Sequence, residues 1–84
     1  MNWYKKIIAI RLTNFSVREV LKKLRNLGYR FIRQGKGSHQ IWGKPGGNSV
    51  SIPVHQMGAT INPVLLKDIV VNRLQIPLEI FLNS

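Results

Sequence analysis

The clearest periodic pattern of apolar and polar positions lies between residues 15 and 28. Apolar side chains recur there every three or four residues, which predicts an amphipathic helix with one buried face. Ser16 and Glu19 have the spacing of a capping box, and Gly28 suits the left-handed conformation that ends many helices. We therefore predict a helix from Phe15 to Gly28. Its buried face consists of Val17, Val20, Leu21, Leu24 and Leu27.

Three short segments after this helix have the composition of strands. Residues 29–34 and 39–42 are rich in aromatic and β-branched residues, and between 49 and 54 apolar residues alternate with Ser49, Ser51 and Pro53. Glycine-rich runs at 35–38 and 43–48 separate the segments, which favours tight connections between antiparallel neighbours. Because proline has no N–H group to donate, we expect Pro53 at a sheet edge or a strand end.

A second helix is predicted from Pro63 to about Leu74, with Asn62 as its N-cap. Pro77 interrupts the pattern, and residues 78–82 predict one last helical turn. The element order α-β-β-β-α predicts an α+β fold: a three-stranded antiparallel sheet with two helices on one face and the other face open. The core side of the second helix is expected to consist of Leu65, Leu66, Ile69, Val70 and Leu74.

The N-terminal residues fit this scheme less clearly. Residues 1–14 suit either an extra helix or an added strand, with Trp3 and Tyr4 available to anchor it to the domain. A chain of 84 residues has room for one domain. We divide it into an N-terminal extension at 1–15 and a domain at 16–84. The apolar run at 7–10 is shorter than the roughly 7 to 15 residues of a signal-peptide core, so we expect a cytoplasmic protein.

The charge balance narrows the range of partners. Lys and Arg number 13 against three acidic residues, which gives a formal net charge of +10. Such a chain is expected to bind a polyanion, and nucleic acid, an anionic membrane and an acidic protein all qualify; a solvated basic face is the simpler alternative. Much of the charge lies between positions 18 and 44, at Arg18, Lys22, Lys23, Arg25, Arg30, Arg33, Lys36 and Lys44.

Several kinds of chemistry are disfavoured by the residues themselves. Glu19, Asp68 and Glu79 all fall in predicted helices, which argues against a pair of catalytic carboxylates. The chain has no cysteine and two histidines without metal-ligand spacing, so we expect neither a metal nor another cofactor. A serine hydrolase is disfavoured because Ser38 and His39, as neighbours on a strand, would point to opposite faces.

His39 is the candidate for catalysis, since it follows a glycine-rich basic loop and has Arg33 and Lys36 close in sequence. On these residues alone, a surface histidine without a role is the alternative. Cleavage of RNA requires little more, because the 2′-hydroxyl is a nucleophile within the substrate, and an imidazole titrating near about pH 6.5 can accept its proton. The leaving 5′-oxygen also needs a proton, and His55, a lysine or water could supply it.

Two motifs carry a resemblance to a known family. The segment from Gly28 to Trp42 resembles the centre of the HicA toxin family, which has an R-Q-x-G-S-H-like stretch after its first helix; here the loop has one additional glycine. The segment from Ser51 to His55 is similar to the second motif of that family, a strand ending in proline, a hydrophobic residue and histidine. The resemblance extends over about residues 16–82.

This resemblance implies a fold like that of a double-stranded RNA-binding domain and the activity of a type II toxin. Such a toxin is a metal-independent endoribonuclease that cleaves mRNA without the ribosome, with His39 as its single catalytic histidine. It would be a monomer when free and a hetero-oligomer with an antitoxin of the HicB family. Two alternatives are a non-catalytic module that binds double-stranded RNA and a basic surface that only docks an acidic protein. We expect RNA binding by Arg33, Lys36, Ser38, Lys22 and Arg30, and a supporting or structural role for His55.

Overall fold

The computed structural model describes residues 11–84. The choice between helix and strand for residues 1–10, and the anchoring expected of Trp3 and Tyr4, lie outside the described residues. The α-β-β-β-α order is confirmed. The elements are α2 (Val17–Asn26), β1 (Arg30–Gln34), β2 (His39–Gly43), β3 (Ser49–Pro53), α3 (Pro63–Lys67), the π-helical segment η1 (Asp68–Arg73) and α4 (Leu78–Leu82).

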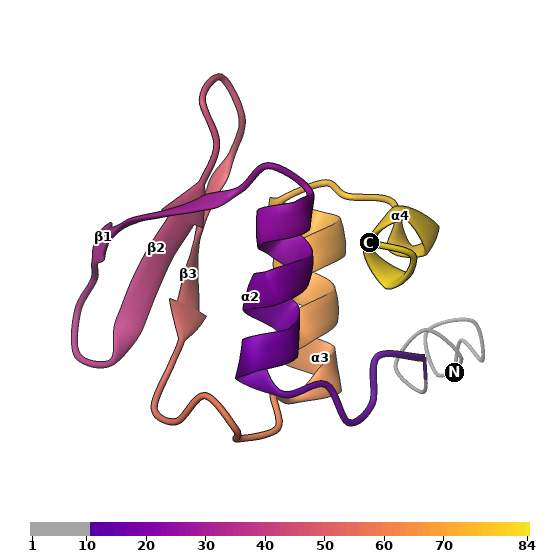
Figure 1. Cartoon of the computed structure of the whole chain (residues 1–84), viewed down its shortest axis with the longest axis horizontal. Helices are drawn as coiled ribbons and strands as arrows, with labels where there is room; N and C mark the ends of the chain where they lie inside the picture. The colour runs from indigo at the N-terminus through magenta and orange to yellow at the C-terminus, as the bar shows by residue number, and fades with distance from the viewer. Residues whose placement is uncertain (1–10) are drawn as a thin grey trace.

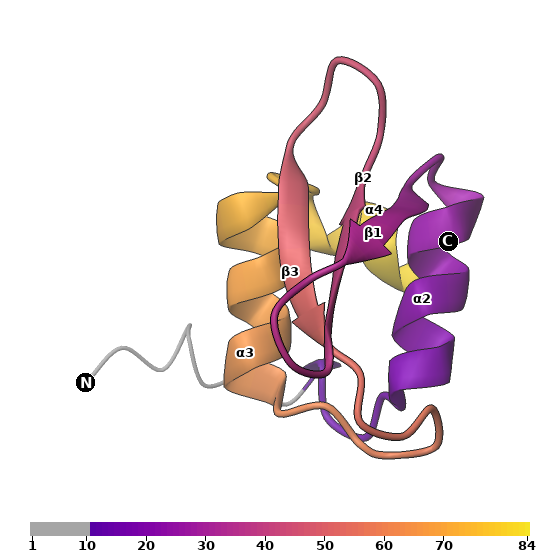
Figure 2. The ribbon, with the colours of Figure 1, turned by 90° about the vertical axis from the view of Figure 1, so that its left-hand side faces the viewer.

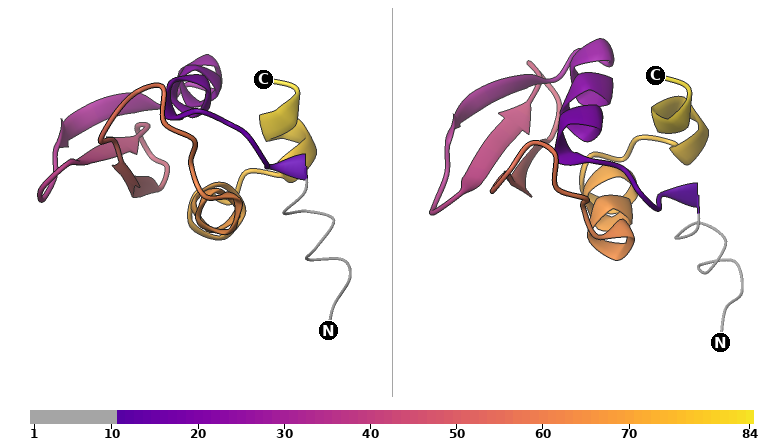
Figure 3. Two further views of the ribbon diagram at one scale, coloured as in Figure 1. Left: turned by 90° about the horizontal axis from the view of Figure 1, so that it is seen from below. Right: turned by 60° about the horizontal axis from the view of Figure 1, so that its bottom comes forward.

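The elements form three layers. The sheet lies on one side, α2 and α3 cover one of its faces, and α4 packs on the far side of these two helices (Figure 1, Figure 3). The other face of the sheet has no helix in front of it (Figure 2). The prediction of two helices on one face of an open antiparallel sheet is therefore confirmed. No helix within residues 11–84 is long and apolar enough to cross a membrane.

The sheet has the order β1-β2-β3, with both pairs antiparallel. Trp42 lies opposite Val50 on β3 and opposite Phe31 on β1, and the side chains of Trp42 and Val50 are buried under the helices. The pairing of β1 shifts after Phe31, so that Ile32 is an extra residue, a β-bulge. The bulge leaves the Ile32 side chain 54% exposed. Pro53 ends the edge strand β3, as expected.

Helix α2 begins at the predicted capping box. The Ser16 hydroxyl accepts a hydrogen bond from the Glu19 N–H at 3.1 Å, and the Glu19 carboxylate accepts one from the Ser16 N–H at 3.0 Å. The N–H group of Val17, in the first turn, donates to the Ala59 carbonyl in the loop between β3 and α3. Gly28 follows the helix with φ +96°, as the sequence predicts. These bonds fix the helix start against the loop that returns from the sheet.

The second predicted helix has the expected bounds but not a single geometry. Only Pro63–Lys67 is α-helical, and the continuation to Arg73 is a π-helix. The neighbours Ile69 and Val70 lie in this π-helical segment, and both side chains are fully buried. Leu66 and Leu74 are also buried as predicted, and Leu65 packs at the margin of the core.

Residues near both ends of the described chain complete the core. Leu12 and Phe81 are fully buried, although they lie far apart in sequence. The rings of Phe15 and Phe81 meet edge to face with centroids 5.8 Å apart. The Lys23 ammonium lies over both rings and donates to the main-chain carbonyls of residues 82 and 84. The helix α4 is thereby held against α2.

Candidate active site

The turn between β1 and β2 is fixed by hydrogen bonds to its own carbonyl groups. The Gly35 N–H donates to the His39 carbonyl at 2.7 Å, and the His39 N–H donates to the Lys36 carbonyl at 3.1 Å. The Gln34 side-chain amide donates to the carbonyls of Gly37 and His39 at 3.1 and 2.9 Å. Gly37 has φ +60°, which favours glycine at this position. The glycine-rich segment is therefore a braced turn that holds His39 at the start of β2.

The imidazole of His39 is exposed and held in one orientation. Its Nδ1 atom lies 3.1 Å from the Lys36 carbonyl oxygen. Because a carbonyl only accepts, Nδ1 carries the hydrogen, and the lone pair of the neutral ring is on Nε2. Nε2 has no hydrogen-bond partner among residues 11–84, and the residue is exposed. A fixed ring with an accessible basic nitrogen has the geometry of a general base.

The second histidine comes to the same end of the sheet. The Val54 N–H donates to the Ser38 carbonyl at 3.1 Å, so the pairing of β2 with β3 continues past both strand ends. The Ser38 hydroxyl lies 3.2 Å from Nε2 of His55. Figures 1 and 2 show the β1–β2 turn beside the end of β3. Ser38 thus lies in the turn and not on a strand, and the histidine that it contacts is His55 and not His39.

Two of the predicted RNA-binding cations lie beside His39. Arg33 lies opposite Ile41 in the sheet register, and Ile41 shares a strand face with His39 because side chains alternate along β2. Trp42, on the alternate face, is buried under the helices, so Arg33 and His39 both belong to the open face. Lys36 lies in the turn itself. Neither cation has a side-chain hydrogen bond or ion pair within the described part of the chain, and both are exposed.

Two other predicted RNA-binding residues lie elsewhere. Arg30 begins β1, at the end opposite to the turn, and its guanidinium donates to the carbonyls of Arg25 and Tyr29 at 2.8 and 2.7 Å, where α2 ends. Lys22 lies on α2 in a small hollow with Lys23 and Ser84. The structure thus brings together Arg33, Lys36, Ser38, His39 and His55 at one end of the sheet, without Arg30 and Lys22.

Comparison with protein families identifies the group to which the chain belongs. The family model described as the HicA toxin of bacterial toxin-antitoxin systems matches residues 17–76. The chain belongs to the HicA toxin family. Neither the search of curated proteins nor the search of solved structures found a match. Membership of the HicA family makes the chain a toxin of a toxin-antitoxin system and implies an antitoxin partner.

The HicA family match covers the whole cluster around His39 but ends before α4. Within the match, sequence reasoning assigned no role to Gln34, whose side chain braces the turn. It also missed the contact between Ser38 and His55, because 17 residues separate them. The available signal for Gln34 was its position directly before a glycine-rich turn. The contact between Ser38 and His55 depends on the register of β3 against β2, which no local pattern encodes.

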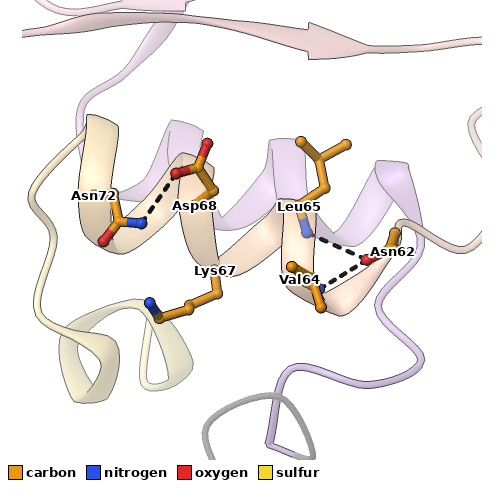
Figure 4. A pocket seen from close by; sticks show the side chains of 6 residues that line it. All are labelled: Asn62, Val64, Leu65, Lys67, Asp68 and Asn72. Atoms are coloured by element: carbon orange, nitrogen blue, oxygen red, sulfur yellow. Dashed lines mark hydrogen bonds between the residues drawn. The ribbon is translucent and has the colours of Figure 1, made fainter. Parts of the chain in front are cut away.

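The hollow in Figure 4 lies away from this cluster, on α3 and η1. Its polar groups are bonded within the helix: Asn62 caps the N–H groups of Val64 and Leu65, and Asn72 donates to Asp68 at 2.9 Å. The bond from Asn72 and the ion pair with Arg73 hold the pKa of Asp68 below its ordinary value. This hollow contains none of the predicted site residues. His39 instead lies exposed at the start of β2.

Proposed function

We propose that this HicA-family toxin is a metal-independent endoribonuclease that cleaves mRNA in the cytoplasm, with His39 as its general base. The observation that carries the proposal is the hydrogen bond from Nδ1 of His39 to the Lys36 carbonyl, which puts the lone pair of the neutral ring on Nε2, where no other described group occupies it. The substrate brings its own nucleophile, the 2′-hydroxyl, so one positioned base is sufficient to start the reaction. DNA lacks this hydroxyl and would resist the same site.

The phosphate charge is matched by Arg33 and Lys36. In the transition state negative charge accumulates on the phosphate oxygens, and fixed cations beside it lower the barrier. Arg33 shares the open face with His39, and the backbone of Lys36 holds the imidazole. The uncovered sheet face gives an RNA strand access to all three. Arg30 and Lys22 then contribute to the wider positive field, since neither lies at the turn.

The substitution His39→Asn tests the base most directly. The Asn amide nitrogen can replace Nδ1 as donor to the Lys36 carbonyl, but asparagine cannot accept the proton of the 2′-hydroxyl. We expect cleavage of a single-stranded RNA in the presence of EDTA to fall about 10² to 10⁴-fold. The thermal unfolding temperature and RNA affinity should change little. The same RNA with 2′-deoxy residues is the matched substrate control and should stay intact.

Two outcomes would contradict the proposal in different ways. Undiminished cleavage by His39→Asn would show that another group is the base. A wild-type protein that binds RNA and leaves it whole would be the non-catalytic RNA-binding module.

The implied antitoxin is proposed to belong to the HicB family and to bind through an acidic surface. The net charge of +10 opposes association of the toxin with itself and favours a monomer when free and a hetero-oligomer with the antitoxin. We also propose that residues 16–84 contain the whole catalytic apparatus. Leu12 lies outside that range and still packs in the core, so a toxin truncated before Ser16 should keep its site and lose stability.

A further inference from the structure

The base-catalysed step proposed above does not use the contact between Ser38 and His55. That step also leaves the proton transfer to the leaving 5′-oxygen unassigned. The leaving 5′-oxygen needs a proton, and His39 has just received one from the 2′-hydroxyl on the attacking side. The Ser38 hydroxyl and Nε2 of His55 are 3.2 Å apart, and the neighbouring main-chain bond from Val54 to Ser38 fixes their approach. His55 is exposed and can exchange protons with water.

The two histidines have different hydrogen-bond partners, which bears on the geometry that phosphoryl transfer requires. Attacking and leaving oxygens lie roughly in line on opposite sides of the phosphorus, so the base and the acid must approach from different directions. The ring of His39 turns back to the Lys36 carbonyl within the turn, whereas the Ser38 hydroxyl reaches across to the residues that follow β3. A phosphate bound between them at the end of the sheet would have a base on one side and a hydroxyl–imidazole pair on the other.

We propose that Ser38 and His55 form a relay that delivers a proton to the leaving 5′-oxygen, an inference that rests on the proposed ribonuclease activity. Protonated His55 donates from Nε2 to the Ser38 oxygen, which leaves the hydroxyl hydrogen of Ser38 directed to the substrate. The 2′-oxygen bonds to phosphorus and gives its proton to Nε2 of His39, while the bond from phosphorus to the 5′-oxygen breaks.

The proton balance of this step is complete without another reactant. The 5′-oxygen keeps the bonding electrons and takes the Ser38 proton, and Ser38 takes the proton of His55. The products are a 2′,3′-cyclic phosphate and a 5′-hydroxyl. His39 ends with one proton more and His55 with one fewer, and water restores both rings. Ser38 is the group that contacts the reacting atom, and His55 acts through it.

A pair of RNA substrates that differ in one atom tests the relay. One has the normal 5′-bridging oxygen at a single cleavable linkage, and the other has sulfur there, which leaves as a thiolate and needs no proton. Ser38→Ala and His55→Ala should cleave the oxygen substrate about 10² to 10⁴-fold more slowly than wild type. Both should cleave the sulfur substrate at close to the wild-type rate. His39→Asn should be impaired on both substrates.

A second variant keeps the test decisive if His55→Ala does not fold. Glutamine at position 55 can still donate a hydrogen bond from its side-chain nitrogen to Ser38, but an amide cannot transfer a proton as an imidazolium does. His55→Gln should therefore cleave the oxygen substrate slowly and the sulfur substrate at close to the wild-type rate. Gln56→Ala, at the exposed neighbouring position, is the matched control and should cleave both at the wild-type rate. Equal losses on both substrates, or full activity of His55→Gln on oxygen, would overturn the relay. A wild type inactive on both substrates would instead reject the ribonuclease proposal.

Discussion

Phe81 is the largest fully buried side chain in residues 11–84, and its replacement by alanine should destabilise the protein strongly. The ring packs edge to face on Phe15 with centroids 5.8 Å apart, and the Lys23 ammonium lies 5.8 Å from its centroid. An alanine at this position makes neither interaction and leaves a cavity between α4 and the rest of the core. Phe81 lies beyond residue 76, where the family match ends, so its importance follows from packing alone.

The expected size of the effect is a large part of the total stability. Truncation of a buried phenylalanine to alanine costs about 3–5 kcal/mol. We expect about 4 kcal/mol, since the substitution removes an aromatic pair and a cation–π interaction together with the buried surface. A folded domain of this length is stable by about 4–13 kcal/mol in total. At about 4–8 °C for each kcal/mol, the unfolding temperature should fall by about 15–30 °C.

Urea denaturation followed by circular dichroism measures the change, with Ile80→Ala as control. Ile80 is the neighbouring residue of the same helix and is 52% exposed, so its replacement should change the free energy of unfolding by less than about 0.5 kcal/mol. The Phe81 variant should still cleave RNA under conditions where it is folded, since α4 lies on the far side of the helices from the sheet. A loss below about 1 kcal/mol for Phe81→Ala would refute this description of the core.

Three further predictions concern the Glu19 carboxylate, Gly43 in the sheet and Lys36 in the β1–β2 turn. Hydrogen bonds from Ser16 hold the pKa of Glu19 below its ordinary value. A carboxylate with a lowered pKa stabilises the folded state at any pH above its pKa in the unfolded chain. The free energy of unfolding should therefore fall as the pH drops below about 4. In acid titrations followed by circular dichroism, Glu19→Gln should show a smaller fall, and an equal fall would contradict the assignment. Gly43→Ala should lower the free energy of unfolding by about 1–3 kcal/mol in urea titrations, because the added methyl carbon would lie 2.9 Å from an Ile32 carbon and 3.2 Å from the Ser49 backbone. An unchanged free energy of unfolding would show that the β-bulge at Ile32 shifts to accommodate the methyl group. Lys36→Gln should weaken RNA binding and reduce the slope of log affinity against log salt by about 0.7, the value for one neutralised phosphate of a single strand; an unchanged slope would place Lys36 off the RNA.

Much of the fold was predictable because its signals are local. A capping box needs only Ser16 and Glu19, and the end of α2 needs only Gly28, so each is legible within a few residues. The three strands follow from short β-rich segments separated by glycine-rich runs. The family resemblance was equally local, since each of its two histidine motifs is contiguous in sequence. It was confirmed by the family match over residues 17–76.

The departures occur where a local pattern permits more than one geometry. The apolar spacing after Asn62 predicts a helix but does not distinguish an α from a π turn. The π-helical segment of the structure buries both Ile69 and Val70 in the core. The positive charge of a residue likewise does not show whether its side chain bonds to the protein itself or stays available on the surface. Arg30 has the same local signal as Arg33, yet its guanidinium closes the end of α2 while Arg33 is exposed on the open face.

The amino-acid sequence alone establishes the element order, the sheet with one open face, the family and the exposed place of His39 after a basic turn. The folded chain was needed to show that Ser38 meets His55, that the carbonyl of Lys36 orients His39, and that Leu12 and Phe81 close one core. The difference follows from the range of the interactions. Caps, turns and periodicity act over a few residues, whereas strand register and core packing join residues whose separation along the chain carries no pattern.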